Sequence, residues 1–168
     1  RVSGDGTDIT LVGISYMLVE CLAARDLLAE VGISAEVIDP VSLMPLDVDT
    51  IANAAQRTGK MLVVDNAWTT AGASAEIIAA VCEHDPGKPL SFGRMGYAPT
   101  TCPTTPELEK EFYPNAATIA AKAYAMVRPD EAAWAAIRNA SAPKPVTPMA
   151  RNTRRTAACS GLDLMRIR

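Results

Sequence analysis

The segment that decides the fold is residues 8–15, which read D-I-T-L-V-G-I-S. It is a short and nearly continuous apolar run, which is typical of a strand buried on both faces of a parallel sheet. Similar runs follow at residues 35–39 and 61–64, and a weaker one lies at residues 90–94. We therefore expect these segments to be strands of one sheet.

Helical periodicity separates these apolar runs. The alternation of strands and helices predicts an α/β fold, with an open and mostly parallel sheet of four to five strands and helices on both faces. The first expected helix runs from Met17 to Val31, and the second from its cap Asp47 to Gly59. The third carries Ala75, Ile78, Ala79 and Cys82 on its inward face. A short helix begins at the cap Thr105 with Pro106 at its first position, and the last runs from Asn115 to Val127.

Two groups of residues are expected inside the domain. Cys21 and Cys82 fall on the predicted apolar helix faces, where we expect them to be small core residues. The expected core of the sheet consists of Ile9, Leu11, Val12, Ile14, Val37, Ile38, Leu62, Val63 and Val64.

The charge of the chain changes near Arg128. Residues 1–128 hold 9 Lys and Arg against 16 Asp and Glu, a balance of −7, whereas residues 129–168 hold 7 against 3, a balance of +4. The second part is also rich in Pro and Ala, so we place a domain boundary between the two. We expect a basic extension at 129–168 that is partly disordered, with a short helix at 130–139.

Composition also argues against several classes of protein. The net charge of −3 and pI near 5.2 disfavour a nucleic-acid-binding module, although the arginines of the extension could touch RNA or an acidic protein. No apolar run is long enough to span a membrane, and residues 1–8 lack the apolar core of a signal peptide. The four cysteines form no C-x-x-C pair, which disfavours a zinc site and favours reduced thiols in a cytoplasmic protein.

Little in the chain predicts catalysis. It lacks G-x-G-x-x-G, G-x-x-x-x-G-K-[ST] and G-x-S-x-G. Asp39 and Asp65 end strands and could act as an acid–base pair or hold a cation, but we expect them to cap or terminate those strands. His84, the only histidine, is expected to interact with a helix carboxyl end. We assign no catalytic, cofactor-binding or metal-binding residue.

Trp68 is the most conspicuous candidate for a contact surface. It lies in a loop after the third strand, and its sequence neighbours Ala67, Thr69, Thr70 and Ala71 offer little apolar cover. Packing within the domain, contact with another subunit and stacking on a ligand all remain open on the residues alone.

Four segments in order resemble the C-terminal domain of the transketolase superfamily. The likeness is greatest to the beta subunit of the thiamine-diphosphate-dependent decarboxylating component of 2-oxo acid dehydrogenase complexes, and it covers residues 1 to about 127. The segments read D-I-T-L-V-G-I-S-Y-M, E-V-I-D-P-V-S-L-M-P-L-D, L-V-V-D-N-A-W-T-T-A-G-A-S-A-E-I and Y-A-P-T-T-C-P-T-T-P-E-L-E-K-E-F-Y-P-N.

The sequence departs from that family at three places. Pro40 and Val41 stand where members often have an arginine after the aspartate, and Asp65-Asn66-Ala67 replaces paired acids and a glycine. The extension after Arg128 is longer than the family usually has, and it could block, replace or extend a contact with an acyltransferase core.

The resemblance implies a non-catalytic assembly domain. The whole enzyme would decarboxylate a 2-oxo acid and transfer the acyl unit to lipoamide, with thiamine diphosphate and magnesium held by domains outside this segment. Residues 1–7 resemble the linker from a pyrimidine-binding domain, and 8–128 the C-terminal domain itself. The implied partners are a second copy of the chain, an alpha subunit that completes a heterotetramer, and a dihydrolipoyl acyltransferase core. The residues expected at interfaces are Trp68, Thr69, Thr70, Tyr97 and Pro99.

Two alternatives stay open. In the first, the chain is the C-terminal domain of a transketolase or of a deoxyxylulose-phosphate-synthase-like enzyme, which it also resembles. A stand-alone binding module of this fold is the other alternative.

Overall fold

Two central strands organise the sheet. In the computed structural model, which describes residues 1–84 and 87–128, β2 (Ile9–Gly13) and β4 (Lys60–Val64) pair in parallel, with Leu11 opposite Leu62. The parallel strand β3 (Ala35–Ile38) flanks β2 on its other side, and β5 (Ser91–Met95) flanks β4. This arrangement confirms the predicted α/β fold with a mostly parallel sheet.

One edge strand was not expected from the sequence. β1 (Val2–Ser3) pairs antiparallel with β3, so that Val2 lies opposite Ile38, and the strand order is β1-β3-β2-β4-β5. The segment predicted as a linker at residues 1–7 therefore contributes to the sheet. A strand of two residues is too short to produce a detectable alternation in the sequence.

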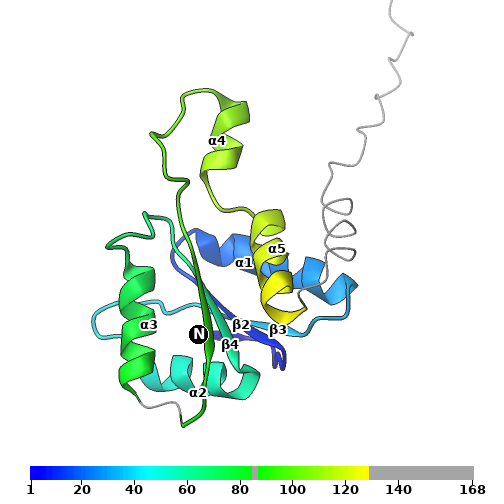
Figure 1. Cartoon of the computed structure of the whole chain (residues 1–168), viewed down its shortest axis with the longest axis vertical. Coiled ribbons are helices and arrows are strands. Elements are labelled where there is room, and N and C mark those ends of the chain that lie inside the picture. The colour runs from blue at the N-terminus through cyan, green and yellow to red at the C-terminus, as the bar shows by residue number, and fades with distance from the viewer. Residues whose placement is uncertain (85–86, 129–168) are drawn as a thin grey trace, which may run out of the picture.

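Helices cover both faces of the sheet, as predicted (Figure 1). α1 (Met17–Glu30) and α5 (Ala116–Val127) pack together on one face, while α2 (Val48–Thr58) and α3 (Ala73–Glu83) cover the other. A short helix, α4 (Pro106–Phe112), lies beyond the carboxyl ends of the strands. The structure therefore has three layers, and α4 extends beyond them.

The buried residues of each strand alternate between the two faces. In β4, Leu62 and Val64 contribute to the core under α1 and α5, whereas Met61 and Val63 contribute to the core under α2 and α3. The whole predicted core set is buried, as is the complete length of β2. A strand with no exposed side is mostly apolar, and its buried polar side chain, Thr10, is hydrogen-bonded, which explains the nearly continuous apolar run at residues 8–15.

Most predicted helix boundaries are confirmed, with one exception. The Asp47 carboxylate accepts from the Thr50 N–H at 3.1 Å and begins α2, and Gly59 ends it with a left-handed φ of 73°. The hydrogen bonds from Thr50 hold the pKa of Asp47 below its usual value. Thr105 is the N-cap residue of α4 and Pro106 occupies its first turn, as expected; the exception is that the Thr105 side chain makes no capping hydrogen bond.

The prediction for the inward face of α3 is wrong, because the residues that the structure buries lie about one position earlier in the sequence than the predicted ones. Its buried residues are Ser74, Ile77 and Val81, whereas Ala79 and Cys82 are exposed. The helix is apolar on nearly all sides, so that its periodicity does not define the face that packs. Cys82 is consequently not a core residue, while Cys21 is buried as expected. The predicted helix at 130–139 lies outside the described residues.

A polar network joins the sheet to α2 at the amino ends of the strands. Glu36 is fully buried, and its carboxylate accepts from the Thr10 hydroxyl at 2.7 Å and pairs with the half-exposed Arg57 guanidinium. The hydroxyls of Thr10 and Thr58 lie 2.9 Å apart. These bonds supply the partners that a buried carboxylate requires.

Replacing Val63 with Asp should unfold the domain, because a buried carboxylate without a partner costs several kcal/mol, on the order of a domain's whole stability. Thermal unfolding followed by circular dichroism measures the effect. The matched control is Val41→Asp, because Val41 is 77% exposed and should tolerate the same change. Melting of Val63→Asp within a few degrees of the parent would show that β4 is not central.

The cysteines should differ in their reactivity toward iodoacetamide. Burial, followed by the charge of Glu20, raises the pKa of Cys21 to about 12, so this thiol stays protonated and inaccessible in the folded chain. Cys82 and Cys102 are exposed and should be alkylated at pH 8. Peptide mass mapping before and after denaturation checks this pattern. Rapid modification of Cys21 in the folded chain, or protection of Cys82, would contradict the assignment.

Candidate functional site

The loop after β4 is anchored at both of its ends. Asp65 is 4% exposed, its N–H donates to the Met95 carbonyl at 2.9 Å, and its carboxylate accepts from the Ser74 N–H at 3.3 Å at the start of α3. Asp39 similarly accepts from the Val41 N–H at 3.0 Å. Both aspartates thus terminate strands through backbone bonds, as expected.

Two glycines allow this loop to pack closely. A Cβ on Gly72 would come within 2.1 Å of the Trp68 carbonyl oxygen, and a Cβ on Gly96 within 2.3 Å of the Ala67 carbonyl oxygen. The Tyr97 N–H also donates to that Ala67 oxygen at 2.9 Å. The backbone after β4 therefore lies directly against the backbone after β5.

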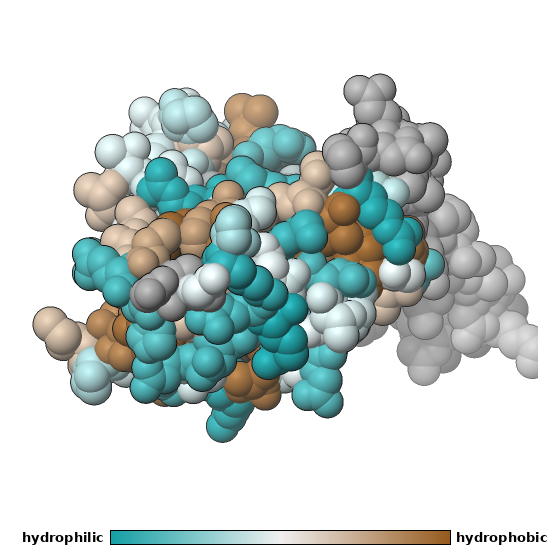
Figure 2. All heavy atoms as spheres, turned by 60° about the horizontal axis from the view of Figure 1, so that its bottom comes forward, coloured by the Kyte–Doolittle hydropathy of each residue, from teal (hydrophilic) through white to brown (hydrophobic). Residues whose placement is uncertain are grey.

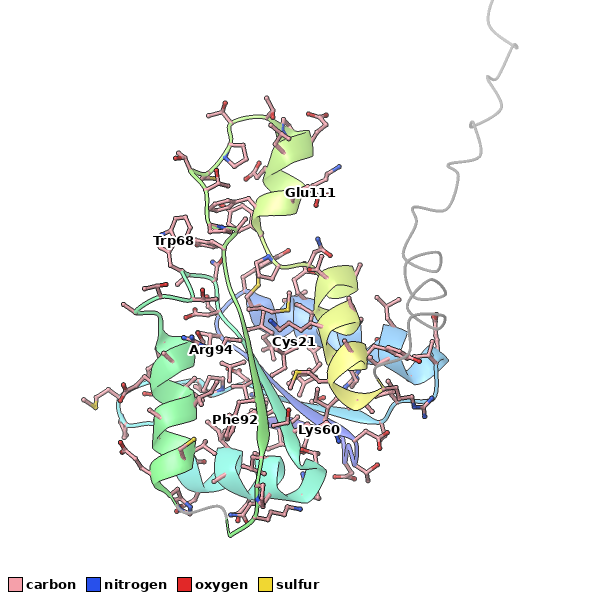
Figure 3. The ribbon with its side chains drawn as sticks, viewed as in Figure 1. Cys21, Lys60, Trp68, Phe92, Arg94 and Glu111 are labelled. Carbon is pink, nitrogen blue, oxygen red and sulfur yellow. The ribbon has the colours of Figure 1, made fainter. Side chains whose placement is uncertain are left out.

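A charged side chain strengthens this junction. The Arg94 guanidinium donates to the Thr69 carbonyl at 2.7 Å, and the Lys122 ammonium donates to the Arg94 carbonyl at 3.0 Å. Figure 3 shows Trp68 at the carboxyl end of the sheet, beyond Arg94 along β5. The position of Trp68 is thus determined by backbone contacts on both sides.

Four aromatic rings meet at this edge and form what we call the aromatic cluster: Trp68, Tyr97, Phe112 and Tyr113. The Trp68 ring meets Tyr97 and Phe112 edge-on at centroid distances of 5.6 and 5.9 Å. Tyr97 stacks on Phe112 at 4.9 Å, and Tyr113 meets both of them edge-on. The Ala98 N–H donates to the Phe112 carbonyl at 2.9 Å, which ties the end of α4 to the sheet.

The cluster is covered on one side only. Phe112 is 4% exposed, whereas Trp68 remains 46% exposed. The sequence neighbours of Trp68 offer little apolar cover, and its ring contacts come instead from distant segments, since Tyr97 and Phe112 both meet the indole edge-on. The uncovered remainder of the ring is an apolar surface presented to solvent.

The five predicted interface residues are placed differently by the structure. Trp68 and Tyr97 are in contact, and Thr69 joins them through its carbonyl bond to Arg94. Thr70 and Pro99 are exposed nearby in the two loops, outside the ring contacts. The sequence analysis missed Phe112 and Tyr113, although an adjacent aromatic pair at the end of a short charged helix was a usable signal.

A thiol and a hydroxyl extend the cluster. The Cys102 sulfur lies 3.7 Å from the Tyr113 hydroxyl oxygen. This contact, followed by burial, raises the pKa of Tyr113 above its usual value. Among residues 1–84 and 87–128, no group of three His, Cys, Asp or Glu side chains is arranged to hold a metal ion.

The only histidine is not part of this site. His84 lies at the carboxyl end of α3, but its Nε2 is 2.7 Å from an Asp49 carboxylate oxygen on α2. Its ring thus pairs with a neighbouring helix, whereas the sequence predicted an interaction with a helix carboxyl end.

Figure 2 shows the opposite end of the molecule, where hydrophilic residues cover most of the visible face and apolar ones form separate patches. None of the described helices is long and apolar enough to cross a membrane.

Comparison with known proteins identifies one domain type. The family model described as the transketolase C-terminal domain matches residues 1–119. The chain is 37% identical over 120 residues to the beta subunit of an acetoin:2,6-dichlorophenolindophenol oxidoreductase from Cupriavidus necator, covering 71% of this chain and 36% of that protein.

Two pyruvate dehydrogenase E1 beta subunits are also similar. The Staphylococcus aureus subunit is 34% identical over 124 residues, covering 73% of this chain and 38% of the relative. The mitochondrial subunit of Dictyostelium discoideum is 40% identical over 84 residues, covering 50% of this chain and 24% of the relative. This chain therefore spans between about a quarter and two fifths of the length of these relatives.

The fold also occurs in a solved structure of another protein. A split-gene transketolase, described as an inactive beta4 tetramer, superimposes with a TM-score of 0.66 and 24% identity. The match covers 76% of this chain and 43% of that one. At this identity the likeness supports the fold alone.

Proposed function

Because this chain belongs to the transketolase C-terminal domain family, we propose that it is the assembly domain of a thiamine-diphosphate-dependent 2-oxo acid dehydrogenase beta subunit. The whole enzyme would decarboxylate a 2-oxo acid and pass the acyl unit to lipoamide. This domain would contribute subunit contacts rather than reacting groups. Its likeness to two E1 beta subunits supports the choice of enzyme.

The half-exposed aromatic cluster is the observation that carries this proposal. Tryptophan and tyrosine are enriched at the centres of protein interfaces, where their rings bury a large area at a small cost in conformational entropy. The bonds from Tyr97 and Arg94 hold the loop in place, so that little ordering is needed on association. A rigid apolar ring beside exposed Thr70 and Pro99 has the composition of an interface core with a polar rim.

The proposed partner of this surface is a second copy of the chain. An alpha subunit, completing a heterotetramer, and a dihydrolipoyl acyltransferase core would bind elsewhere on the assembly. The relatives are named as subunits, which supports function within a larger complex.

A second candidate follows from the Cupriavidus necator relative. Its name describes oxidation of acetoin, and its match covers nearly as much of this chain as the Staphylococcus aureus subunit does. The same assembly role could therefore belong to an acetoin-oxidising enzyme. Assaying the complete beta subunit together with its alpha subunit on pyruvate and on acetoin would decide between the two substrates.

Replacing Trp68 with Ala should shift the chain toward monomer. A buried indole at an interface centre contributes about 2 kcal/mol or more, which corresponds to a roughly 30-fold weaker association. Circular dichroism should not change, because Tyr97, Phe112 and Tyr113 still pack on one another. Sedimentation velocity at several concentrations measures the shift.

Two further variants complete this test. Thr70→Arg adds a charge beside the ring without removing any ring contact, and it should weaken association in the same direction. Met44→Ala removes a side chain that is 91% exposed in the loop after β3 and should leave association unchanged. If Trp68→Ala unfolds the chain, Trp68 is a core residue; if the oligomer persists with the fold intact, the interface lies elsewhere.

We expect no thiamine diphosphate site among the described residues. The first amides of α1 already donate to the chain, with the Met17 N–H bonded to the Ile14 carbonyl at 3.1 Å and the Leu18 N–H to Ser15 at 3.1 Å. The Asp65 carboxylate is occupied by the Ser74 N–H. The amides at the start of α1 thus offer no free cradle for a diphosphate.

Titration calorimetry of the chain with thiamine diphosphate and magnesium should therefore show only heats of dilution. The expected result follows from the bonded amides of α1 and the occupied Asp65 carboxylate. A micromolar affinity that requires magnesium would contradict the assignment of this segment as an assembly domain.

A further inference from the structure

A cavity of about 550 Å³ lies at the carboxyl ends of β2 and β4, where successive connections of the chain lead to opposite sides of β2. From β2 the chain passes through α1 to β3 on one side, and from β3 it crosses through α2 to β4 on the other side. Tyr16, which follows β2, and Asn66, which follows β4, both line the cavity. Open α/β sheets bind ligands at such switch points, outside the carboxyl ends of the strands.

The walls of this cavity are aromatic and apolar. Tyr16, Tyr97 and Tyr113 contribute three rings, and Met17 and Pro114 contribute apolar atoms. A cavity of this size and composition is in the range that holds a small organic ligand. Three rings around one space favour a planar apolar group, which can stack on them or meet them edge-on.

The cavity also contains one charge of each sign. Glu20 of α1 and Lys110 of α4 both line it, yet they do not form an ion pair with each other. One Glu20 oxygen accepts from the Ala116 N–H at 2.8 Å, which fixes the carboxylate at the start of α5. Within the described parts of the chain, its other oxygen and the Lys110 ammonium have no hydrogen-bond or ion-pair partner.

A neutral polar group completes the lining. The Asn66 amide has no hydrogen-bond partner among residues 1–84 and 87–128, whereas Asn115 uses its oxygen for the Thr118 N–H and its nitrogen for the Lys110 carbonyl. An amide can accept from an ammonium and donate to a carboxylate. The free charged and amide groups of the lining are therefore one anion, one cation and one amide, beside the hydroxyls of Tyr16 and Tyr97.

We propose that this cavity binds a free α-amino acid with an aromatic side chain. Its ammonium group would pair with Glu20, its carboxylate with Lys110, and its ring would lie among the tyrosines. A 2-oxo acid would leave the Glu20 carboxylate facing a second anion, and a simple amine would leave the Lys110 ammonium without a partner. A zwitterion can pair with both charges at once.

This site does not depend on the proposed assembly role. The two share Tyr97, whose ring centroid is 5.6 Å from that of Trp68, so the fluorescence of Trp68 should report binding in the cavity. The ligand titration and the sedimentation experiment are separate measurements, and each can fail without the other.

The test is a titration of the chain with L-phenylalanine, which does not absorb at the wavelength used to excite tryptophan. The other tryptophan, Trp134, is replaced by Phe so that Trp68 alone is observed. The expected result is a saturable change in emission, matched by calorimetry. 3-Phenylpropionate and 2-phenylethylamine, which each lack one charge, should bind about tenfold more weakly, the effect of losing one charged hydrogen bond.

Matched variants assign the two charges. Glu20→Gln keeps an acceptor for the Ala116 N–H and should remove the advantage of phenylalanine over 3-phenylpropionate. Lys110→Gln should remove its advantage over 2-phenylethylamine, and Glu107→Gln, on the same helix but outside the cavity lining, should change neither. Absence of saturable binding by calorimetry, or equal affinity for the three ligands in the unmodified cavity, would overturn the proposal.

Discussion

The parallel pairing of β2 with β4 is the constraint on which the rest of the structure depends. All five residues of β2 are buried, so both faces of the sheet have to be covered by helices. Because the two strands run in the same direction, their carboxyl ends meet at one edge, and each connection must return along the sheet. That geometry brings the segments after Gly13 and Val64 together, although they are distant in sequence.

The aromatic cluster and the cavity are both consequences of this edge. Gly96 lets the backbones after β4 and β5 approach to a distance that no side chain would permit, and Gly72 lets the loop after β4 fold back on its own Trp68 carbonyl. The loop is thereby fixed, and one face of Trp68 is left without cover. Tyr97 belongs to both features, so that an assembly surface and a ligand site would lie next to each other at the carboxyl end of the sheet.

The sequence predicts the layers of this fold better than its contacts. A strand buried on both faces is mostly apolar, and for that reason residues 8–15 and 61–64 identified the sheet and its core. The face of α3 could not be predicted, because a helix that is apolar on most sides has no preferred face until the Asp65–Ser74 bond orients its first turn.

The contacts at the carboxyl edge are long-range and have no local pattern. Trp68 was identified as a surface candidate from its loop, but its contact with Phe112 depends on the position of α4, which no periodicity specifies. Glu20 and Lys110 likewise lie 90 residues apart along the chain, yet both line the same cavity in the folded domain. Contacts between side chains that are distant in sequence leave no local pattern from which they could be predicted.

The central claim is that the free face of Trp68 is covered when the chain assembles. Acrylamide quenching of Trp68 in the Trp134→Phe variant, measured over a range of protein concentrations, tests it most directly. The account predicts that the quenching constant falls as sedimentation shows the oligomer forming, because the 46% of the side chain now exposed becomes buried. A quenching constant that stays the same while the chain associates would contradict the account.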